Sequence, residues 1–290
     1  MHPSSFEYFA PTKMEEALDL LSKYKGDAKI MAGGQSLIPL LKLRIASFPY
    51  VIDISGLNGM RGISEEGEYL EIGALATISD IEENEMVRER YTILHEAAVQ
   101  IADPLIRNRG TIGGNLSHGD PSNDMPSVAI ALKAKMEVIG KEGVRLIEGD
   151  SFITDSFTNS MNEGEILRRV LIPAVKGSTG GCYIKQKKSA GDFSVAAVAV
   201  QLSLNENESI RSAGIGLTSV APKPLRAMRA EKFLEGKKIS DSVVKEAAKI
   251  VVSESDPSTD FYGTSEFKKK VLERITEEAI NVSFERALVR

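Results

Sequence analysis

The sequence has 290 residues, of which 42% are apolar, a formal net charge of −5 and a single cysteine. This length predicts about two domains, and one thiol cannot form an intramolecular disulfide or, by itself, an iron–sulfur or structural zinc site. The acidic balance argues against a nucleic-acid binder, and no apolar run approaches the roughly 20 residues of a membrane span. The first residues also lack the features of a secretory signal, so we expect a cytoplasmic protein with no metal of its own.

The first 55 residues predict a small α/β unit in which a glycine turn joins a strand to a helix. Thr12 and Glu15 have the spacing of a capping box, and apolar residues then recur with helical spacing from Met14 to Leu21. The expected elements are a helix from Met14, a buried strand over 28–32, a helix over 37–43 and a buried strand over 50–54.

Residues 56–175 predict an α+β arrangement, because short strands alternate with helices without a regular βαβ repeat. The expected strands lie around 69–72, 136–139 and 144–147. Ser79 and Glu82 have the spacing of a helix cap, the apolar face over 93–102 indicates a helix that Pro104 stops, and a further helix runs from Asp124 to Lys133.

Linker-type residues over 173–181 predict a boundary between a domain over 1–175, with subdomains over 1–55 and 56–175, and a domain over 178–290. The second domain is expected to contain a three-stranded antiparallel sheet followed by helices. Its strands are predicted over 182–187, 195–204 and 211–220, with a hairpin loop over 205–208 and helices from Arg229, Asp241 and Thr264; the basic run over 268–270 is expected to be solvated.

Two glycine pairs follow apolar stretches, at Gly33 and Gly34 and at Gly113 and Gly114. Glycine allows close backbone approach and positive φ, so successive N–H groups can converge on an anion such as a phosphate. Either pair could instead form an ordinary turn. Neither matches the Rossmann fingerprint or the P-loop.

The second pair lies in a segment over 102–124 that is rich in glycine, proline, asparagine and aspartate but contains apolar anchors. Long anchored loops often carry function. Asp124 lies where a carboxylate could either cap the following helix or accept hydrogen bonds from ribose or ribityl hydroxyls.

Several motifs, in this order and spacing, resemble the FAD-binding medium subunit of molybdenum hydroxylases, the group that includes xanthine dehydrogenase, aldehyde oxidoreductase and aerobic carbon monoxide dehydrogenase. They are Ala-Gly-Gly-Gln-Ser at 32–36, Ile-Arg-Asn-Arg-Gly-Thr-Ile-Gly-Gly-Asn at 106–115, Gly-Glu-Ile-Leu at 164–167, and Tyr-Ile-Lys at 183–185 with Asp192. The resemblance covers nearly the whole chain.

The resemblance implies an FAD-binding domain of the vanillyl-alcohol-oxidase (PCMH) type with two subdomains, followed by a C-terminal domain of the carbon monoxide dehydrogenase flavoprotein type that closes over the flavin. In the family, the segment matching 29–37 wraps the pyrophosphate and that matching 111–115 supports it from the other side. The implied FAD contacts are Lys29, Ile30, Met31, Ala32, Gly33, Gly34, Gln35, Ser36, Leu37, Ala102, Ile106, Thr111, Gly113, Gly114, Asn115, Asp124, Leu167 and Lys185.

The same resemblance implies a role in electron transfer in which no residue of this chain acts as a general acid or base. A large molybdopterin subunit would oxidise an aldehyde, a purine-like heterocycle or carbon monoxide. A small subunit would carry two [2Fe–2S] clusters, and the FAD would pass electrons to an external acceptor in a dimer of heterotrimers.

Departures from the family pattern refine this expectation. Gln35 stands where histidine is common in relatives, so we expect non-covalent FAD. No cysteine-bearing insertion is present, which argues against the branch with an additional cluster; Cys182 is expected to be a small strand residue and His118 an exposed loop histidine. The alternatives are an NADPH-dependent flavin reductase of the related cell-wall fold and a non-catalytic nucleotide-binding module.

Overall fold

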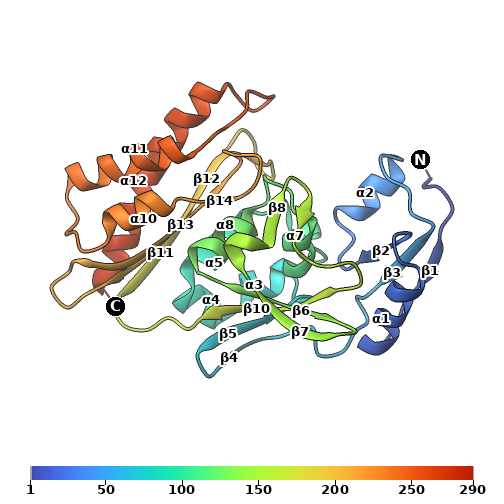
Figure 1. Ribbon diagram of the computed structural model, residues 1–290. Helices are drawn as coiled ribbons and strands as arrows, with labels where there is room; N and C mark the ends of the chain where they lie inside the picture. Colours follow the sequence, from blue (N-terminus) through green and yellow to red (C-terminus); the bar gives the residue numbers. More distant parts are fainter. Residues whose placement is uncertain (1, 290) are drawn as a thin grey trace.

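The computed structural model describes residues 2–289 and contains four sheets together with the helices that pack on them (Figure 1). The N-terminal unit is a parallel three-stranded sheet in the order β1-β3-β2, with the central strand buried at Val51 and Ile52. Its elements are β1 (Glu7–Phe9), α1 (Met14–Lys23), β2 (Ala28–Met31), α2 (Leu37–Lys42) and β3 (Tyr50–Asp53).

Two local predictions for this unit are wrong. The capping box does not form, because Lys13 is the N-cap of α1 and the Thr12 N–H donates to the Glu16 carboxylate at 3.3 Å. Strand β2 is only half-buried, because it lies at the edge of its sheet. The helix itself is confirmed, with Ala17, Leu18 and Leu21 facing the core.

The middle unit is an antiparallel five-stranded sheet in the order β4-β5-β10-β6-β7, with helices packed beside it. The strands are β4 (Ile63–Glu66), β5 (Tyr69–Gly73), β6 (Lys135–Gly140), β7 (Gly143–Glu148) and β10 (Ile166–Pro173). The other elements are α3 (Ile78–Glu83), α4 (Glu85–Arg90), α5 (Thr92–Gln100), α6 (Pro104–Arg107), α7 (Ile112–His118), α8 (Asp124–Ala131), α9 (Gly149–Phe152), β8 (Ile153–Asp155) and β9 (Thr158–Asn159).

The caps of this unit differ from the predicted ones. Thr77 and Asp80 form the capping box of α3, two residues before the predicted pair. Pro104 does not stop α5, which has already ended at Gln100; it occupies the first turn of α6, whose N-cap Asp103 accepts two backbone hydrogen bonds. Proline suits this position because its missing N–H needs no partner there.

The C-terminal sheet contains the three predicted strands, β11 (Thr179–Lys187), β12 (Ser194–Leu204) and β13 (Ile210–Thr218). A fourth strand, β14 (Leu225–Arg226), was missed because it is only two residues long and follows two prolines. Alternate side chains of β12 enter different cores, Ala197 and Ala199 on one face and Val198 and Val200 on the other. The predicted α+β class is confirmed.

Helices α10 (Met228–Leu234), α11 (Asp241–Glu254) and α12 (Ser265–Val289) cover the second face of this sheet (Figure 1). Lys268, expected to be solvated, is buried in α12 and pairs with Asp260 at 2.6 Å. No helix within residues 2–289 combines the length and the apolar character that crossing a bilayer would require.

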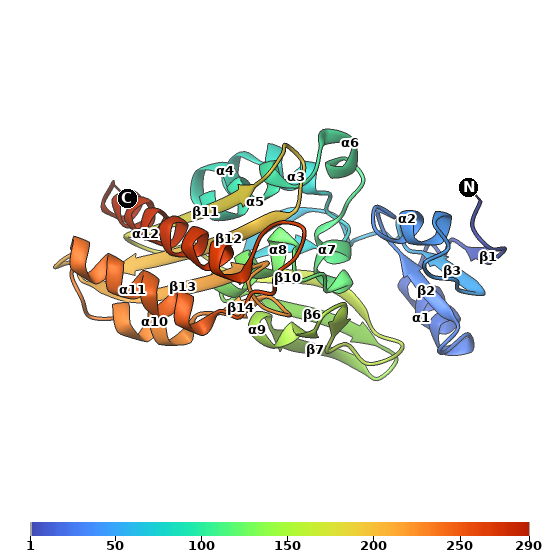
Figure 2. The same cartoon turned by 90° about the horizontal axis from the view of Figure 1, so that it is seen from above.

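Helix α8 packs on the opposite face of the C-terminal sheet at the distance of backbone contact. A Cβ at Gly214 would lie 2.0 Å from the carbonyl oxygen of Ala131, and one at Gly216 would lie 2.0 Å from that of Ser127. Figure 2 shows α7 and α8 between the N-terminal unit and the C-terminal sheet. The two glycines therefore bring the start of α8 close to the side chains of β11.

Candidate functional site

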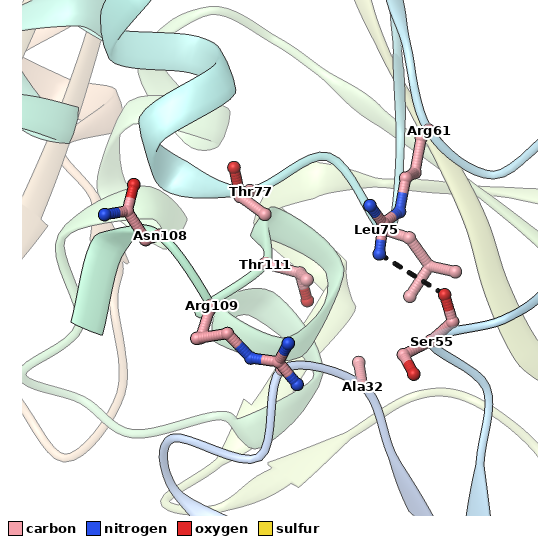
Figure 3. Close-up of a pocket in the computed structure, with 9 residues that line it drawn as sticks. Ala32, Ser55, Arg61, Leu75, Thr77, Asn108, Arg109 and Thr111 are labelled. Carbon is pink, nitrogen blue, oxygen red and sulfur yellow. Dashed lines mark hydrogen bonds between the residues drawn. The ribbon is translucent and has the colours of Figure 1, made fainter. Parts of the chain in front are cut away.

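A pocket lies where the turn after β2 meets the segment between α6 and α7 (Figure 3). The turn contributes Ala32 and Gly33, and the second segment contributes Asn108, Arg109 and Thr111. Its remaining lining residues are Ser55, Arg61, Leu75 and Thr77. The structure thus brings parts of both glycine segments to one place.

Gly33 is required for this close approach. A Cβ at Gly33 would lie 1.9 Å from the carbonyl oxygen of Arg109, so no side chain fits there without moving the backbone. Gly34 adopts a φ of +74°, in the left-handed region that favours glycine. The conformation of this turn therefore depends on both glycines.

The backbone N–H groups of the turn are free. Within the described residues, the amides of Gly33, Gly34, Gln35 and Ser36 donate no hydrogen bond, whereas Ile38 at the start of α2 already donates to the carbonyl oxygen of Gly34 at 2.9 Å. Successive unpaired amides form a concave site that suits an anion. This agrees with the interpretation of the first glycine pair.

The second glycine pair does not offer such donors. Ile112 and Gly113 donate to the carbonyl oxygens of Ala76 and Ala74, at 3.0 and 2.9 Å, and Gly114 donates to the Thr111 hydroxyl at 3.1 Å. The expectation that both pairs present converging amides is therefore wrong for this one. The segment instead leaves the Asn115 Oδ1 atom buried without a hydrogen-bond partner.

Two arginines line the pocket, and none of its nine lining residues is acidic (Figure 3). Arg61 donates to the carbonyl oxygen of Ser55 at 3.3 Å, and the Arg109 side chain has no partner among the described residues. The pocket therefore favours an anion. Arg109 lies inside the 106–115 motif but was not among the predicted contacts, and nothing in the sequence pointed to Arg61.

Asp124 and Lys185 form a second, buried cluster. Asp124 does not cap α8, because Asn123 is the N-cap; its Oδ2 lies 2.9 Å from the Lys185 Nζ, and the Tyr183 hydroxyl donates to its Oδ1. Burial raises the pKa of Asp124, and the Lys185 ammonium and the Tyr183 hydrogen bond oppose that rise. The Asp124 and Lys185 side chains therefore form an ion pair with each other and are shielded from solvent.

The other predicted contacts are spread over several elements. Gly34 and Gln35 line a separate hollow along α2, and Leu167 is buried in the core of the middle sheet, outside the pocket. Ala102, with a φ of +44°, and Ile106 are half-buried around the start of α6. Lys29, Ile30, Met31, Ser36 and Leu37 continue the first segment on either side of the turn.

Neither His118 nor Cys182 belongs to the pocket. His118 ends α7, half-buried with its ring 5.3 Å from that of Phe157, and burial lowers its pKa, so the expectation of an exposed loop histidine is wrong. Cys182 is a small buried residue of β11, as expected, and burial raises its pKa to about 12.

Comparison with known families gives two matches that together cover most of the chain. Residues 4–175 match the FAD binding domain in molybdopterin dehydrogenase, and residues 181–282 match the CO dehydrogenase flavoprotein C-terminal domain. The chain belongs to the FAD-binding medium subunits of molybdenum hydroxylases. The resemblance expected from the motifs is confirmed.

Relatives of this medium subunit match over almost their whole length. The carbon monoxide dehydrogenase medium chain of Hydrogenophaga pseudoflava is 37% identical, covering 99% of both chains. The glyceraldehyde dehydrogenase medium chain of Sulfolobus acidocaldarius is 36% identical, covering 96% of this chain and 98% of the relative. Both are dehydrogenase subunits, so this medium subunit is the flavoprotein component of an oxidoreductase.

Solved structures agree with this assignment. A chain of the carbon monoxide dehydrogenase of H. pseudoflava superposes with a TM-score of 0.96 at 38% identity, covering 99% of each chain. A chain of quinoline 2-oxidoreductase from Pseudomonas putida 86 superposes with a TM-score of 0.92 at 29% identity, again covering 99% of each. The medium-subunit fold extends over the whole described chain.

Proposed function

We propose that this medium subunit binds FAD non-covalently and that the free amides at positions 33–36 hold its pyrophosphate. The observation that carries this proposal is the set of four unpaired N–H groups beside a pocket lined by Arg109 and Arg61. Amides and guanidinium groups are the donors that bind phosphate oxygens. The unpartnered Asn115 Oδ1 would accept a hydrogen bond from a hydroxyl group of the cofactor.

We also propose that Ala102, Ile106, the start of α7, Leu167 and the Asp124–Lys185 pair contact the cofactor, as the family resemblance implies. We also propose the division into an FAD-binding domain over 1–175, with subdomains over 1–55 and 56–175, and a C-terminal domain over 178–290.

In the complex, this chain would pass electrons from the [2Fe–2S] clusters of a small subunit through FAD to an external acceptor. FAD, when bound, supplies the conversion between one-electron and two-electron transfer. A large molybdopterin subunit would oxidise the substrate, and the assembly would be a dimer of heterotrimers in the cytoplasm. Relatives that are medium chains and a solved Cu,Mo carbon monoxide dehydrogenase support a molybdenum-containing partner subunit.

The substrate class is that of the relatives' complexes. Their names include carbon monoxide dehydrogenase, glyceraldehyde dehydrogenase and quinoline 2-oxidoreductase. We therefore propose carbon monoxide, an aldehyde or an aromatic heterocycle. A self-sufficient NADPH-dependent flavin reductase is not favoured, because both matched families and the full-length relatives belong to dehydrogenase complexes.

Production of this chain with its partner subunits tests the proposal. We expect one FAD per chain, and we expect bleaching of the flavin absorbance when the complex receives its substrate. Gly114→Val should weaken FAD binding without unfolding the chain, since a Cβ at Gly114 would lie 2.9 Å from the Thr111 hydroxyl and 3.9 Å from the Ala32 Cβ, and both of these residues line the pocket. A complex of this variant that retains stoichiometric FAD contradicts the site, and NADPH oxidation by the isolated chain contradicts the function.

A further inference from the structure

Three buried polar side chains meet where the start of α8 faces β11. Tyr183 and Lys185 are two residues apart on the strand, so both side chains point to the same face of the sheet. Across the sheet they align with Ala199 and Ala197, whose small side chains leave room for α8. Asp124, the first residue of α8, lies against both polar side chains.

The carboxylate of Asp124 has one donor on each oxygen. The Tyr183 hydroxyl donates to Oδ1, and the Lys185 ammonium lies 2.9 Å from Oδ2. The carboxylate is 6% exposed and the lysine side chain is 2% exposed, so water replaces neither partner. A buried ion pair is stable only when further hydrogen bonds complete it, and the phenol supplies the one this pair needs.

The phenol remains a donor at any working pH. Burial and the adjacent Asp124 carboxylate raise the pKa of Tyr183 well above its ordinary value. The hydroxyls of Thr218 and Ser127 also interact with this phenol, and Thr218 itself donates to Ser127 at 2.7 Å. Tyr183 is therefore a protonated donor held from β13 and α8 as well as from its own strand.

One N–H group of the Lys185 ammonium has no acceptor among the described residues. The ammonium has three protons, and the described residues supply two acceptors, Asp124 Oδ2 and the carbonyl oxygen of Gln100 at 3.4 Å. The third proton has no acceptor within residues 2–289. It can therefore be donated to a ligand without breaking the ion pair.

We propose that Tyr183 is a positioning residue, whose phenol holds the Asp124 carboxylate so that Asp124 fixes the Lys185 ammonium with one proton left for an acceptor oxygen or nitrogen of the cofactor. The contacts among Tyr183, Asp124 and Lys185 do not depend on the proposed function; only the hydrogen bond from Lys185 to the cofactor rests on it. Without the phenol, Asp124 loses one of its two donors. Lys185 and Lys187 then remain as the charged groups that favour its ionised form.

Titration of Asp124 in the full chain tests the positioning directly. Carbon-13 NMR of labelled aspartate carboxyls, with the Asp124 signal assigned by its loss in Asp124→Asn, should show Tyr183→Phe raising the pKa of Asp124 by about one to two units, the effect of one charge-assisted hydrogen bond. Tyr91→Phe is the matched control, since Tyr91 is a buried tyrosine bonded to Glu65 elsewhere. An unchanged Asp124 titration in Tyr183→Phe overturns the proposal.

Fluorotyrosine at position 183 gives an independent result if Tyr183→Phe does not fold. Its stronger phenol donor should lower the pKa of Asp124, and no change would again contradict the positioning.

The bound flavin supplies the second readout. In Tyr183→Phe, protonated Asp124 leaves the positive charge of Lys185 uncompensated, so the flavin midpoint potential should rise more steeply than in wild type as pH falls. If the pKa of Asp124 shifts in Tyr183→Phe but the flavin midpoint potential does not change, Tyr183 still positions Asp124, and the cofactor does not lie beside the Asp124–Lys185 pair.

Discussion

The turn after β2 and the segment that leads into α7 both contribute residues to the same pocket, yet the two glycine pairs use their backbone amides differently. The amides at 33–36 have no protein partner within the described residues, whereas those at 112–114 donate to Ala76, Ala74 and Thr111. A Gly-Gly pair can thus provide an anion site or allow a helix to pack tightly. The difference depends on which acceptors the rest of the chain brings to each pair.

Substitution of Gly113 should give the largest change. Its Cβ would lie 2.6 Å from both the Cβ and the carbonyl oxygen of Ala74, so α7 cannot stay in place. We expect Gly113→Ala to lower the free energy of unfolding by about 3 kcal/mol in urea titration. Gly114→Ala, whose Cβ would meet only side-chain atoms, should remain within about 0.5 kcal/mol of wild type. Equal losses of unfolding free energy in both variants would show that Gly113 has no special packing role.

Replacement of Arg109, the unpaired cation of the pocket, should lower the affinity for FAD without changing the stability of the fold. Arg109 has no partner to lose within residues 2–289, so Arg109→Gln should leave the urea midpoint unchanged. FAD affinity, measured by flavin fluorescence quenching, should fall about 10- to 100-fold, the effect of one charge-assisted hydrogen bond of about 1.5–3 kcal/mol. Arg88→Gln, on exposed α4, is the control. Unchanged FAD affinity in Arg109→Gln would place the pyrophosphate elsewhere.

A side chain at Gly34 should disturb the turn itself. The positive φ and the Ile38 Cδ1 atom, 2.7 Å from the added Cβ, both oppose Gly34→Ala. We expect a loss of about 1–2 kcal/mol in unfolding free energy. The loss of FAD affinity should exceed that of Gly114→Ala, because the free amides move with the turn. Equal affinity in the two alanine variants would show that the two glycine segments serve the cofactor alike.

The smallest effect concerns pH and the end of α7. Burial lowers the pKa of His118 in the folded chain, so the unfolded chain binds more protons once pH falls below the ordinary histidine value. The contribution of His118 to stability is therefore present near neutral pH and lost as pH falls. Between about pH 7.5 and about pH 5.5, the urea midpoint of His118→Gln should fall less than that of wild type. Identical falls would contradict this linkage.

Local patterning predicted many of the elements, and the family resemblance identified the class. The strands predicted over 182–187 and 195–204 correspond to β11 and β12, and the spacing of α1 buried Ala17 and Leu18 as expected. Capping was less predictable: Thr77 and Asp80 cap α3, whereas Ser79 and Glu82 have the same spacing. Several overlapping pairs satisfy one capping rule, and tertiary packing selects among them.

The site depends on contacts that local patterns do not contain. The Asp124–Lys185 pair forms because Gly214 and Gly216 allow α8 to approach the sheet, and these residues lie about 90 positions beyond Asp124 in the chain. The amides at 112 and 113 are occupied because a distant segment offers the carbonyl oxygens of Ala76 and Ala74. Such long-range partners decide whether a glycine pair or a carboxylate remains available to a ligand.

Amide hydrogen exchange can show whether the pyrophosphate occupies the free amides at 33–36. In the complex with its partner subunits, exchange would be followed at single-residue resolution with FAD bound and after FAD removal. We predict that FAD slows exchange at 33–36 at least about tenfold, because the pyrophosphate occupies these free amides, while exchange at 112–114 is already slow and changes little. Protection that appears at 112–114 and not at 33–36 would contradict it.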